Sequence, residues 1–275
     1  VNDFARLAKT VIQIDLDPAQ LDNRFKADVN IHATCEQFYK VYLQSINKLS
    51  LISKDWINTL EQHWQNSFIN EYPELKMSPF NICEILSKRF NNIATHFVAD
   101  VGNNQMWIAH SLRIGRSQMI HHSGGLGAMG FAIPTSLGVH YATDNIVVSI
   151  SGDGGAQLNI QELDIISREK LPILTIIVNN QSLGMVRAFQ EMYFDGRNQS
   201  TFWDGYSSSF CEIGKAYQMK SSQITSEDEF DSAILEFIQN PQPTLLELVM
   251  PDARECKPRL AFGNPIDKQH PNGNT

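Results

Sequence analysis

The chain has 275 residues, of which 42% are apolar and 19% charged, which is ample material for one well-buried core and a second small one. Its formal net charge is -8 and it has no Lys- or Arg-rich run, so nucleic acid and anionic membranes are poor candidates as partners. No apolar run approaches the roughly 20 residues that a membrane-spanning helix needs, and the first residues show no signal-peptide pattern. These features predict a globular, cytoplasmic protein.

The four cysteines lie far apart in the sequence and form no CxxC pair, which is typical of reduced thiols in a cytoplasmic protein. His32 and Cys35 could contribute to a zinc site, but the sequence offers no second pair of ligands.

The first fifty residues are predicted to form a separate unit, with a strand at residues 10–15 and a helix at 35–46. The chain opens at Val1 and enters this strand almost at once, so we expect it to begin inside a domain whose other strands lie outside these residues. The polar, aromatic stretch 51–78 is predicted to be a connector, partly helical.

Strands and helices alternate in residues 79–251, which we expect to be the main domain, followed by a surface tail at 252–275. Runs rich in Val, Ile and Leu predict buried parallel strands at residues 96–101, 145–151, 173–178 and 244–250. Helices are predicted at residues 125–141, 159–169 and 227–238. The expected fold class is therefore α/β, a doubly wound parallel sheet with helices on both faces.

Two polar, glycine-containing turns follow two of these strands: Gly152-Asp153-Gly154-Gly155 and Asn179-Asn180-Gln181-Ser182-Leu183-Gly184. Ligands of open α/β sheets bind just beyond the carboxyl ends of the strands, where such turns can converge on one anion. Glycines let backbone N–H groups approach phosphate oxygens, and Asp and Asn supply the oxygen ligands that magnesium prefers.

Each turn alone is weak evidence, because a GDG can be an ordinary turn and an NN pair a polar loop. The two are separated by 24 residues, from Gly155 to Val178, the length of one helix and the next strand. A nicotinamide-binding Rossmann domain is disfavoured, because no GxGxxG opens a strand–helix turn with an acid about 20 residues further on.

The pair of turns resembles the thiamine-diphosphate signature, GDG followed after about 25 residues by NN. A longer likeness, close over residues 95–190, points to the acetolactate synthase (acetohydroxyacid synthase) large-subunit family, of which the chain resembles the C-terminal portion. It is carried by Gln105-Met106-Trp107, by the glycine-rich residues 123–131, by Asn159-Ile160-Gln161-Glu162-Leu163 and by residues 171–186.

The resemblance implies a bound thiamine diphosphate and Mg²⁺, with Asp153, Asn180 and Ser182 as metal ligands. The residues it implies for cofactor binding are Gly102, Asn103, Asn104, Gly127, Met129, Asp153, Gly154, Gly155, Asn180, Ser182, Leu183, Gly184 and Met185. Within this set Gly127 would offer its carbonyl to the aminopyrimidine, and Met129 would be the apolar wedge that holds the cofactor bent. Without the surrounding match, Met129 would read as a core-filling methionine.

Three further residues are possible catalytic residues: Gln105 as a substrate contact, and His121 and His122, near the expected mouth of the pocket, as proton shuttles. A structural or merely exposed role is the competing interpretation for the two histidines.

Some positions depart from the family. A tryptophan that favours 2-oxobutyrate as acceptor is replaced by Phe189, and the usual Gln-His pair before Gln105 by Asn103-Asn104. Residues 12–18 resemble the end of the family's middle domain, whose acid would contact a flavin (FAD), but His32-Ala33-Thr34 stand where a Gly-Asp is usual.

The resemblance also implies that the activating glutamate lies outside this chain, on a pyrimidine-binding domain of a neighbouring subunit. We therefore expect a homodimer or homotetramer, and a chain that is catalytically incomplete by itself. The implied reaction is decarboxylation of pyruvate or a related 2-oxo acid and transfer of the two-carbon unit to an acceptor. The alternatives are acetyl transfer to a nucleotide-linked ketosugar in surface-polysaccharide synthesis, to which residues 257–266 bear a less specific likeness, and a cofactor-binding module without chemistry.

Overall fold

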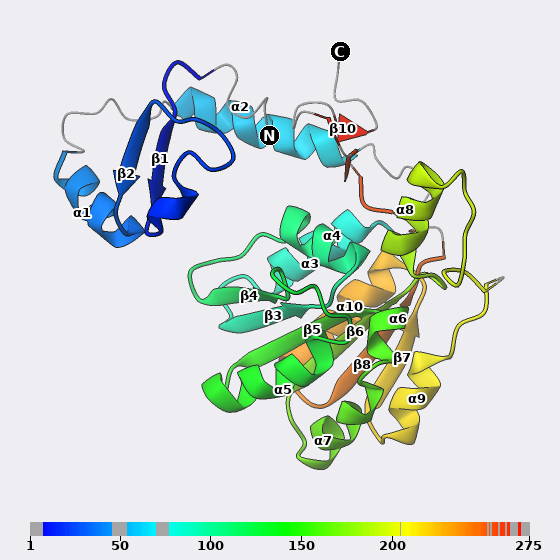
Figure 1. The fold of residues 1–275 in the computed structure, drawn as a ribbon. Coiled ribbons are helices and arrows are strands. Elements are labelled where there is room, and N and C mark those ends of the chain that lie inside the picture. The colour runs from blue at the N-terminus through cyan, green and yellow to red at the C-terminus, as the bar shows by residue number, and fades with distance from the viewer. Residues whose placement is uncertain are drawn as a thin grey trace. The chain divides into compact units, whose positions relative to one another are not determined.

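The computed structural model describes residues 8–45, 54–69, 77–203, 205–251, 253, 255–257, 259–261, 263–264 and 269–270. The chain divides into two compact units, a larger one of residues 72–256 and a smaller one that combines residues 1–71 with 257–275 (Figure 1). The domain limits drawn from the sequence remain predictions.

The larger unit is built on a six-stranded sheet in which all strands are parallel. In order across the sheet these are β4 (Gln118–His122), β3 (Thr95–Ala99), β5 (Ile146–Gly152), β6 (Ile173–Asn179), β8 (Thr244–Val249) and β7 (Lys220–Ile224). Every residue of β3 and β6 is buried, as expected for strands covered on both faces. The predicted fold class is confirmed.

Helices cover both faces of this sheet (Figure 1). One face carries α3 (Pro79–Arg89), α4 (Asn103–Ser111) and α10 (Glu227–Gln239). The other carries α5 (Ala132–Thr143), α7 (Leu163–Arg168) and α9 (Phe210–Ala216). The remaining helices of the described part of this unit are α6 (Asp153–Ala156), α8 (Gly184–Tyr193) and a 3₁₀ turn at Ile160–Glu162.

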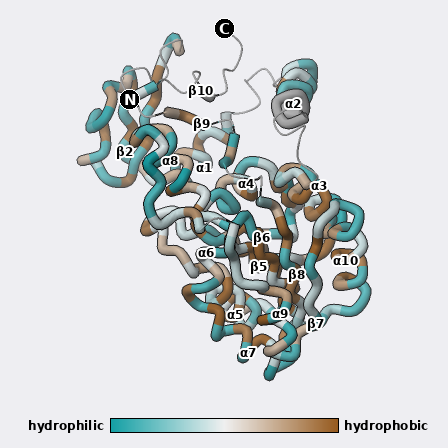
Figure 2. The backbone as a smooth tube through the Cα atoms, turned by 90° about the vertical axis from the view of Figure 1, so that its right-hand side faces the viewer, coloured by the Kyte–Doolittle hydropathy of each residue, from teal (hydrophilic) through white to brown (hydrophobic). Residues whose placement is uncertain are grey.

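Two apolar cores result, one on each side of the sheet. On the first side Phe97 and Ile176 pack with Phe230 of α10, and on the second Val98 and Ile177 pack among apolar residues of α5, α7 and α9. Figure 2 shows the hydrophobic residues concentrated along β5, β6 and β8. Burial of these side chains holds the strand ends in a fixed register, which matters because the polar turns begin there.

The strands predicted from Val, Ile and Leu runs are present within one or two residues of their expected limits. No strand was predicted at β4 or β7, because these are edge strands with polar residues such as Ser221, Ser222 and Gln223.

The helix predicted at residues 125–141 begins later, at Ala132. Its first residues form a loop, in which Gly127 has φ +68° and Gly130 has φ +81°. A helix cannot continue through such left-handed positions, so the glycine-rich stretch stays outside it.

The smaller unit contains β1 (Ile12–Asp15), β2 (Val29–His32) and α1 (Cys35–Ser45). We expected the strand at residues 10–15 to have its sheet partners outside these residues, and this is wrong, since β1 pairs in parallel with β2. No strand was predicted at β2, because Val29 and Ile31 are its only apolar residues and they alternate with the polar Asn30 and His32.

The same unit holds α2 (Lys54–Ile69) and an antiparallel pair, β9 (Arg259–Leu260) with β10 (Gln269–His270). The connector predicted to be partly helical thus contains a 16-residue helix. Within the described residues, no helix has the length and apolar character that crossing a bilayer requires.

Candidate functional site

The candidate site lies at the carboxyl edge of the larger sheet, where β3, β5 and β6 end. From β3 the chain moves outward to β4, and from β5 it moves the other way to β6, so the direction of winding reverses between the neighbouring strands β3 and β5. Such a reversal separates the loops that follow the two strands and leaves a crevice between them. The turns after β3 and β5 flank this crevice, and the turn after β6 adjoins it.

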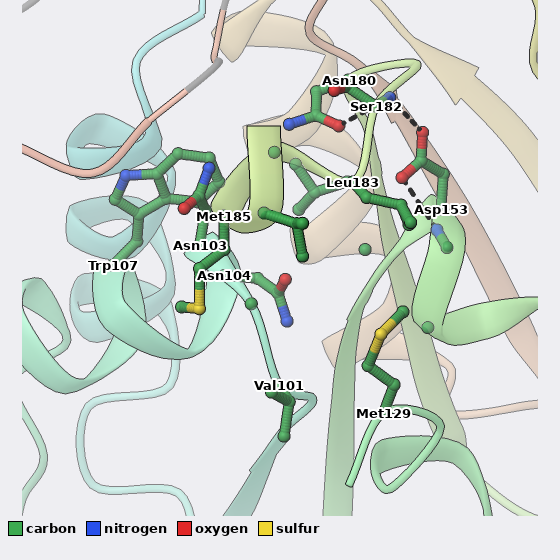
Figure 3. Close-up of a pocket in the computed structure, with 17 residues that line it drawn as sticks. Val101, Asn103, Asn104, Trp107, Met129, Asp153, Asn180, Ser182, Leu183 and Met185 are labelled. Atoms are coloured by element: carbon green, nitrogen blue, oxygen red, sulfur yellow. Dashed lines mark hydrogen bonds between the residues drawn. The ribbon is translucent and has the colours of Figure 1, made fainter. Parts of the chain in front are cut away.

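An open cleft of about 520 Å³ of empty space occupies this position (Figure 3). The cleft gathers every residue named from the sequence as cofactor-binding except Gly127. Five residues outside that predicted set also line the cleft: Val101, Trp107, Gly152, Val178 and Val186.

Asp153, Asn180 and Ser182 form a hydrogen-bonded group at one side of the cleft (Figure 3). The N–H of Ser182 donates to Asp153 Oδ2 at 3.1 Å and to Asn180 Oδ1 at 3.2 Å, and the N–H of Gly154 donates to Asp153 Oδ1 at 2.8 Å. All three residues are buried. The carboxylate and the amide oxygen therefore face the same backbone N–H and lie close together.

The orientation of the Asn180 amide is set from behind the cleft. Its Nδ2 donates to the carbonyl of Ala253 at 2.9 Å, which leaves Oδ1 on the cleft side, where it accepts from Ser182. An oxygen facing the cleft is the atom that a magnesium ion needs.

The preceding residue, Asn179, is held by a buried carboxylate. Asn179 Nδ2 donates to Glu247 Oε1 at 2.6 Å, and the N–H of Cys211 donates to the other carboxylate oxygen at 2.9 Å. Glu247 is on β8, so it connects the Asn-Asn turn to the neighbouring strand. This network has no local sequence signal, because its partners are 68 and 36 residues apart.

Burial raises the pKa of Asp153 to about 6, and hydrogen bonds from the N–H groups of Gly154, Ser182 and Gln181 oppose part of that rise. The pKa is high because the carboxylate is desolvated with little compensating positive charge. A divalent cation at this place would supply that charge.

Met129 lies across the cleft from Asn180 and Ser182, and Leu183, which follows Ser182, faces it over Gly154 (Figure 3). A Cβ on Gly154 would collide with Leu183 Cδ2 and lie 3.5 Å from Met129 Cε. The second glycine of the GDG turn therefore leaves room for the Leu183 side chain, which would have to move if residue 154 carried a Cβ.

Three helices begin at the cleft without a side-chain cap: α4, after Gly102, α6, after Gly152, and α8, after Leu183. Uncapped N-terminal N–H groups and the positive end of the helix dipole favour an anion such as a phosphate.

Asn104, in the first turn of α4, ties two strand ends together. Its Nδ2 donates to the carbonyl of Asp100 at 2.8 Å, and its Oδ1 stands at the crevice beside Gly102 and Gly152. The turn after β3 is therefore rigidly joined to the rim of the cleft.

Four predicted residues do not line the cleft: Gly127, Gln105, His121 and His122. The two histidines lie in the edge strand β4, and His121 Nε2 is 2.9 Å from His96 Nδ1, with the rings stacked. This contact favours the structural interpretation of His121 over a role in proton shuttling. Burial and the neighbouring His121 lower the pKa of His96.

The donors that the cleft offers to a metal are oxygens, from one carboxylate, one amide and the backbone, which suits a hard cation such as Mg²⁺. In the part of the chain that the structure describes, no three His, Cys, Asp or Glu side chains cluster as metal ligands. His32 Nε2 is 2.8 Å from the carbonyl of Leu16, so its contact is structural and gives no support to the zinc alternative.

Residues 100–248, more than half of the chain, match the family described as "Thiamine pyrophosphate enzyme, C-terminal TPP binding domain". The chain is also similar to the "Probable acetolactate synthase large subunit" of Methanocaldococcus jannaschii, with 32% identity over 94% of this chain and 45% of that protein. The "Acetolactate synthase isozyme 3 large subunit" of Escherichia coli is 29% identical over 94% of this chain and 46% of its own length. "Acetolactate synthase 1, chloroplastic" of Oryza sativa subsp. japonica is 30% identical over 96% and 42%.

The chain thus spans a little under half the length of these relatives. The match covers both polar turns and the loop after β3, the segments that converge on the cleft. The chain therefore belongs to the thiamine pyrophosphate enzyme family, of which it contains the C-terminal cofactor-binding domain.

Proposed function

We propose that this chain is the thiamine-diphosphate- and Mg²⁺-binding half of an acetolactate-synthase-like enzyme. In this proposal the enzyme decarboxylates pyruvate or a related 2-oxo acid and transfers the two-carbon unit to an acceptor. The observation that carries it is the buried Asp153–Ser182–Asn180 group at the switch point of the sheet, facing an apolar wall across one cleft.

The metal would be held by Asp153 through its carboxylate, by Asn180 through Oδ1 and by Ser182 through its backbone carbonyl. The first two oxygens are already brought together by the N–H of Ser182, so little rearrangement is needed to bind a cation. The diphosphate would lie between this metal and the N-termini of α4 and α8, where Gly102, Asn103 and Asn104 form the rim.

The ring portion would occupy the apolar side, with Met129 as the wedge and Leu183 and Met185 beside it. When bound, thiamine diphosphate supplies an electron-accepting ring for the pair released as carbon dioxide leaves. The contribution of these side chains is to orient the ring and keep water from it. Gly127, which is outside the cleft, would offer only its carbonyl.

The complete reaction would need residues beyond this chain, since the chain spans less than half of its relatives. We propose that the activating acid comes from a pyrimidine-binding domain of a neighbouring subunit in a cytoplasmic homo-oligomer. The acceptor would approach along α8, where Val186 lines the cleft and Phe189 follows one turn later.

The test is product analysis of the full-length protein with pyruvate, thiamine diphosphate and Mg²⁺. Acetolactate together with carbon dioxide is the expected outcome. Carbon dioxide without acetolactate would overturn the proposed transfer to pyruvate and leave a different acceptor to be sought, beginning with a nucleotide-linked ketosugar. Tight cofactor binding with no turnover of pyruvate, alone or with that acceptor, would favour a binding module.

A further inference from the structure

Asp100 is a buried carboxylate directly after β3 that the proposed function does not use. Its side chain is fully buried, and none of the ion pairs found in the described part of the chain involves it. Three backbone N–H groups donate to it instead, those of Val101 at 2.8 Å, Gly130 at 3.0 Å and Ala132 at 2.9 Å. Burying a carboxylate is costly, so its position calls for a role that repays this.

Two of these donors belong to the glycine-rich loop, residues 123–130, and to the start of α5. Gly130 is held from both sides, since its N–H donates to Asp100 Oδ1 and its carbonyl accepts from Asn159 Nδ2 at 2.8 Å. Gly130 has a φ of +81°, which any other residue would adopt only with strain, and an added Cβ would lie 2.7 Å from Asn159 Nδ2. Gly130 is therefore fixed, and Met129, the residue before it, lines the cleft.

The same carboxylate also touches the other wall of the site. A Cβ on Gly155 would lie 2.8 Å from Asp100 Oδ1, so the fourth residue of the Gly-Asp-Gly-Gly turn packs directly against it. One side chain thus joins the turn after β3, the turn after β5 and the glycine-rich loop. Desolvation raises the pKa of Asp100, while the three N–H groups favour its ionised form.

We propose that Asp100 is a positioning residue that sets the distance between the diphosphate anchor and Met129, and so holds the glycine-rich loop ready for the ring of the cofactor. This rests on the proposed binding of thiamine diphosphate. The anchor itself does not depend on Asp100, because Asp153, Asn180 and Ser182 are held by their own hydrogen bonds and by Ala253.

The test variant is Asp100→Asn in the full-length protein, compared with Asp231→Asn as a matched control. The amide has one acceptor oxygen in place of two, so at least one N–H loses its partner and faces a second donor. Asp231 undergoes the same chemical change on α10, where it pairs with Arg89 away from the cleft.

Two measurements separate positioning from a general loss of structure. Calorimetric titration should show thiamine diphosphate with Mg²⁺ binding about tenfold more weakly to Asp100→Asn, and inorganic diphosphate with Mg²⁺ binding as to the wild type. Amide hydrogen exchange without ligand should be faster in residues 123–132 and unchanged in the Asp153 and Ser182 turns. The control should match the wild type in both.

The proposal would be overturned if Asp100→Asn bound both ligands more weakly by the same factor, or if its amide hydrogen exchange in residues 123–132 equalled that of the wild type. If the wild type bound neither ligand, the proposed function would fail, and hydrogen exchange would still decide whether Asp100 holds the loop. If Asp100→Asn does not fold, Asn159→Ala is the second variant, because it removes the hydrogen bond to the carbonyl of Gly130. It should weaken binding of thiamine diphosphate, but not of inorganic diphosphate, by a smaller factor than Asp100→Asn. Equal affinities of this variant and the wild type for thiamine diphosphate would contradict the proposal.

Discussion

The two sides of the cleft differ in how they are held. On the metal side Asp153, Asn180 and Ser182 are 8%, 7% and 3% exposed, and each is fixed by hydrogen bonds to neighbouring turns. On the apolar side Met129 is 37% exposed, and the loop that carries it, in which Leu126 is 89% exposed, is anchored mainly at its Gly130 end. The comparison teaches that a site for a charged ligand needs polar groups that are held in place before the ligand binds, whereas an apolar surface can be left open for another domain to cover.

The most severe test of the metal side is Asp153→Ala. Removing the only carboxylate of the group should weaken binding of Mg²⁺ with thiamine diphosphate, and of Mg²⁺ with inorganic diphosphate, by at least about 100-fold each. Calorimetric titration of both ligands measures this. If only the thiamine diphosphate affinity fell, Asp153 would belong to the ring side and the comparison would be wrong.

The pH dependence of stability tests the same carboxylate without any ligand. Below its ordinary pKa of 3.8 Asp153 is protonated in both the folded and the unfolded chain, so it makes no difference. As the pH rises toward about 6, the folded chain keeps the extra proton, so the wild type should lose up to about 3 kcal/mol of stability that Asp153→Asn keeps. Thermal unfolding at a series of pH values compares the two. If the stabilities of the wild type and Asp153→Asn changed with pH in the same way, burial of the ionised Asp153 carboxylate would not reduce the stability of the fold.

A smaller loss is expected when the support behind the metal side is altered. Glu247→Gln places an amide NH₂ against the Nδ2 of Asn179 or the N–H of Cys211, so the Asn-Asn turn should shift and Mg²⁺-diphosphate affinity should fall about tenfold. Asp231→Asn serves as the control for a carboxyl-to-amide change. Unchanged affinity in Glu247→Gln would mean that the turn is held without it.

The smallest effect should come from the apolar side. Met129→Ala removes part of the wall opposite Leu183, so thiamine diphosphate should bind about fivefold more weakly while inorganic diphosphate is unaffected. The ratio of the two affinities is the quantity to measure. A fall in both would show that Met129 supports the diphosphate as well, and would remove the distinction between the two sides.

Much of this arrangement could be predicted from sequence, because it depends on local patterns. Runs of Val, Ile and Leu marked β3, β5, β6 and β8, and the polar turns after them fell at one edge because parallel strands end together. The grouping of Asp153 with Asn180 followed from the spacing of the two turns.

Other features could not be predicted, because they depend on partners distant in the sequence. The late start of α5 follows from the left-handed φ angles of Gly127 and Gly130, and Asp100 holds this conformation by accepting from the N–H groups of Gly130 and Ala132, which are 30 and 32 residues away. Glu247 reads as one polar residue in an apolar strand, and only the pairing of β6 with β8 shows that it holds Asn179. The contact between His121 and His96 could not be predicted, because it depends on the pairing of β3 with the polar edge strand β4, which was not predicted.

The most direct test of the central claim is a calorimetric titration of the full-length protein with thiamine diphosphate, with Mg²⁺ and with Mg²⁺ removed by a chelator. If the cleft binds the diphosphate through a metal held by Asp153, Asn180 and Ser182, binding should be tight with Mg²⁺ and at least about 100-fold weaker without it. Equal affinity under the two conditions would contradict the account.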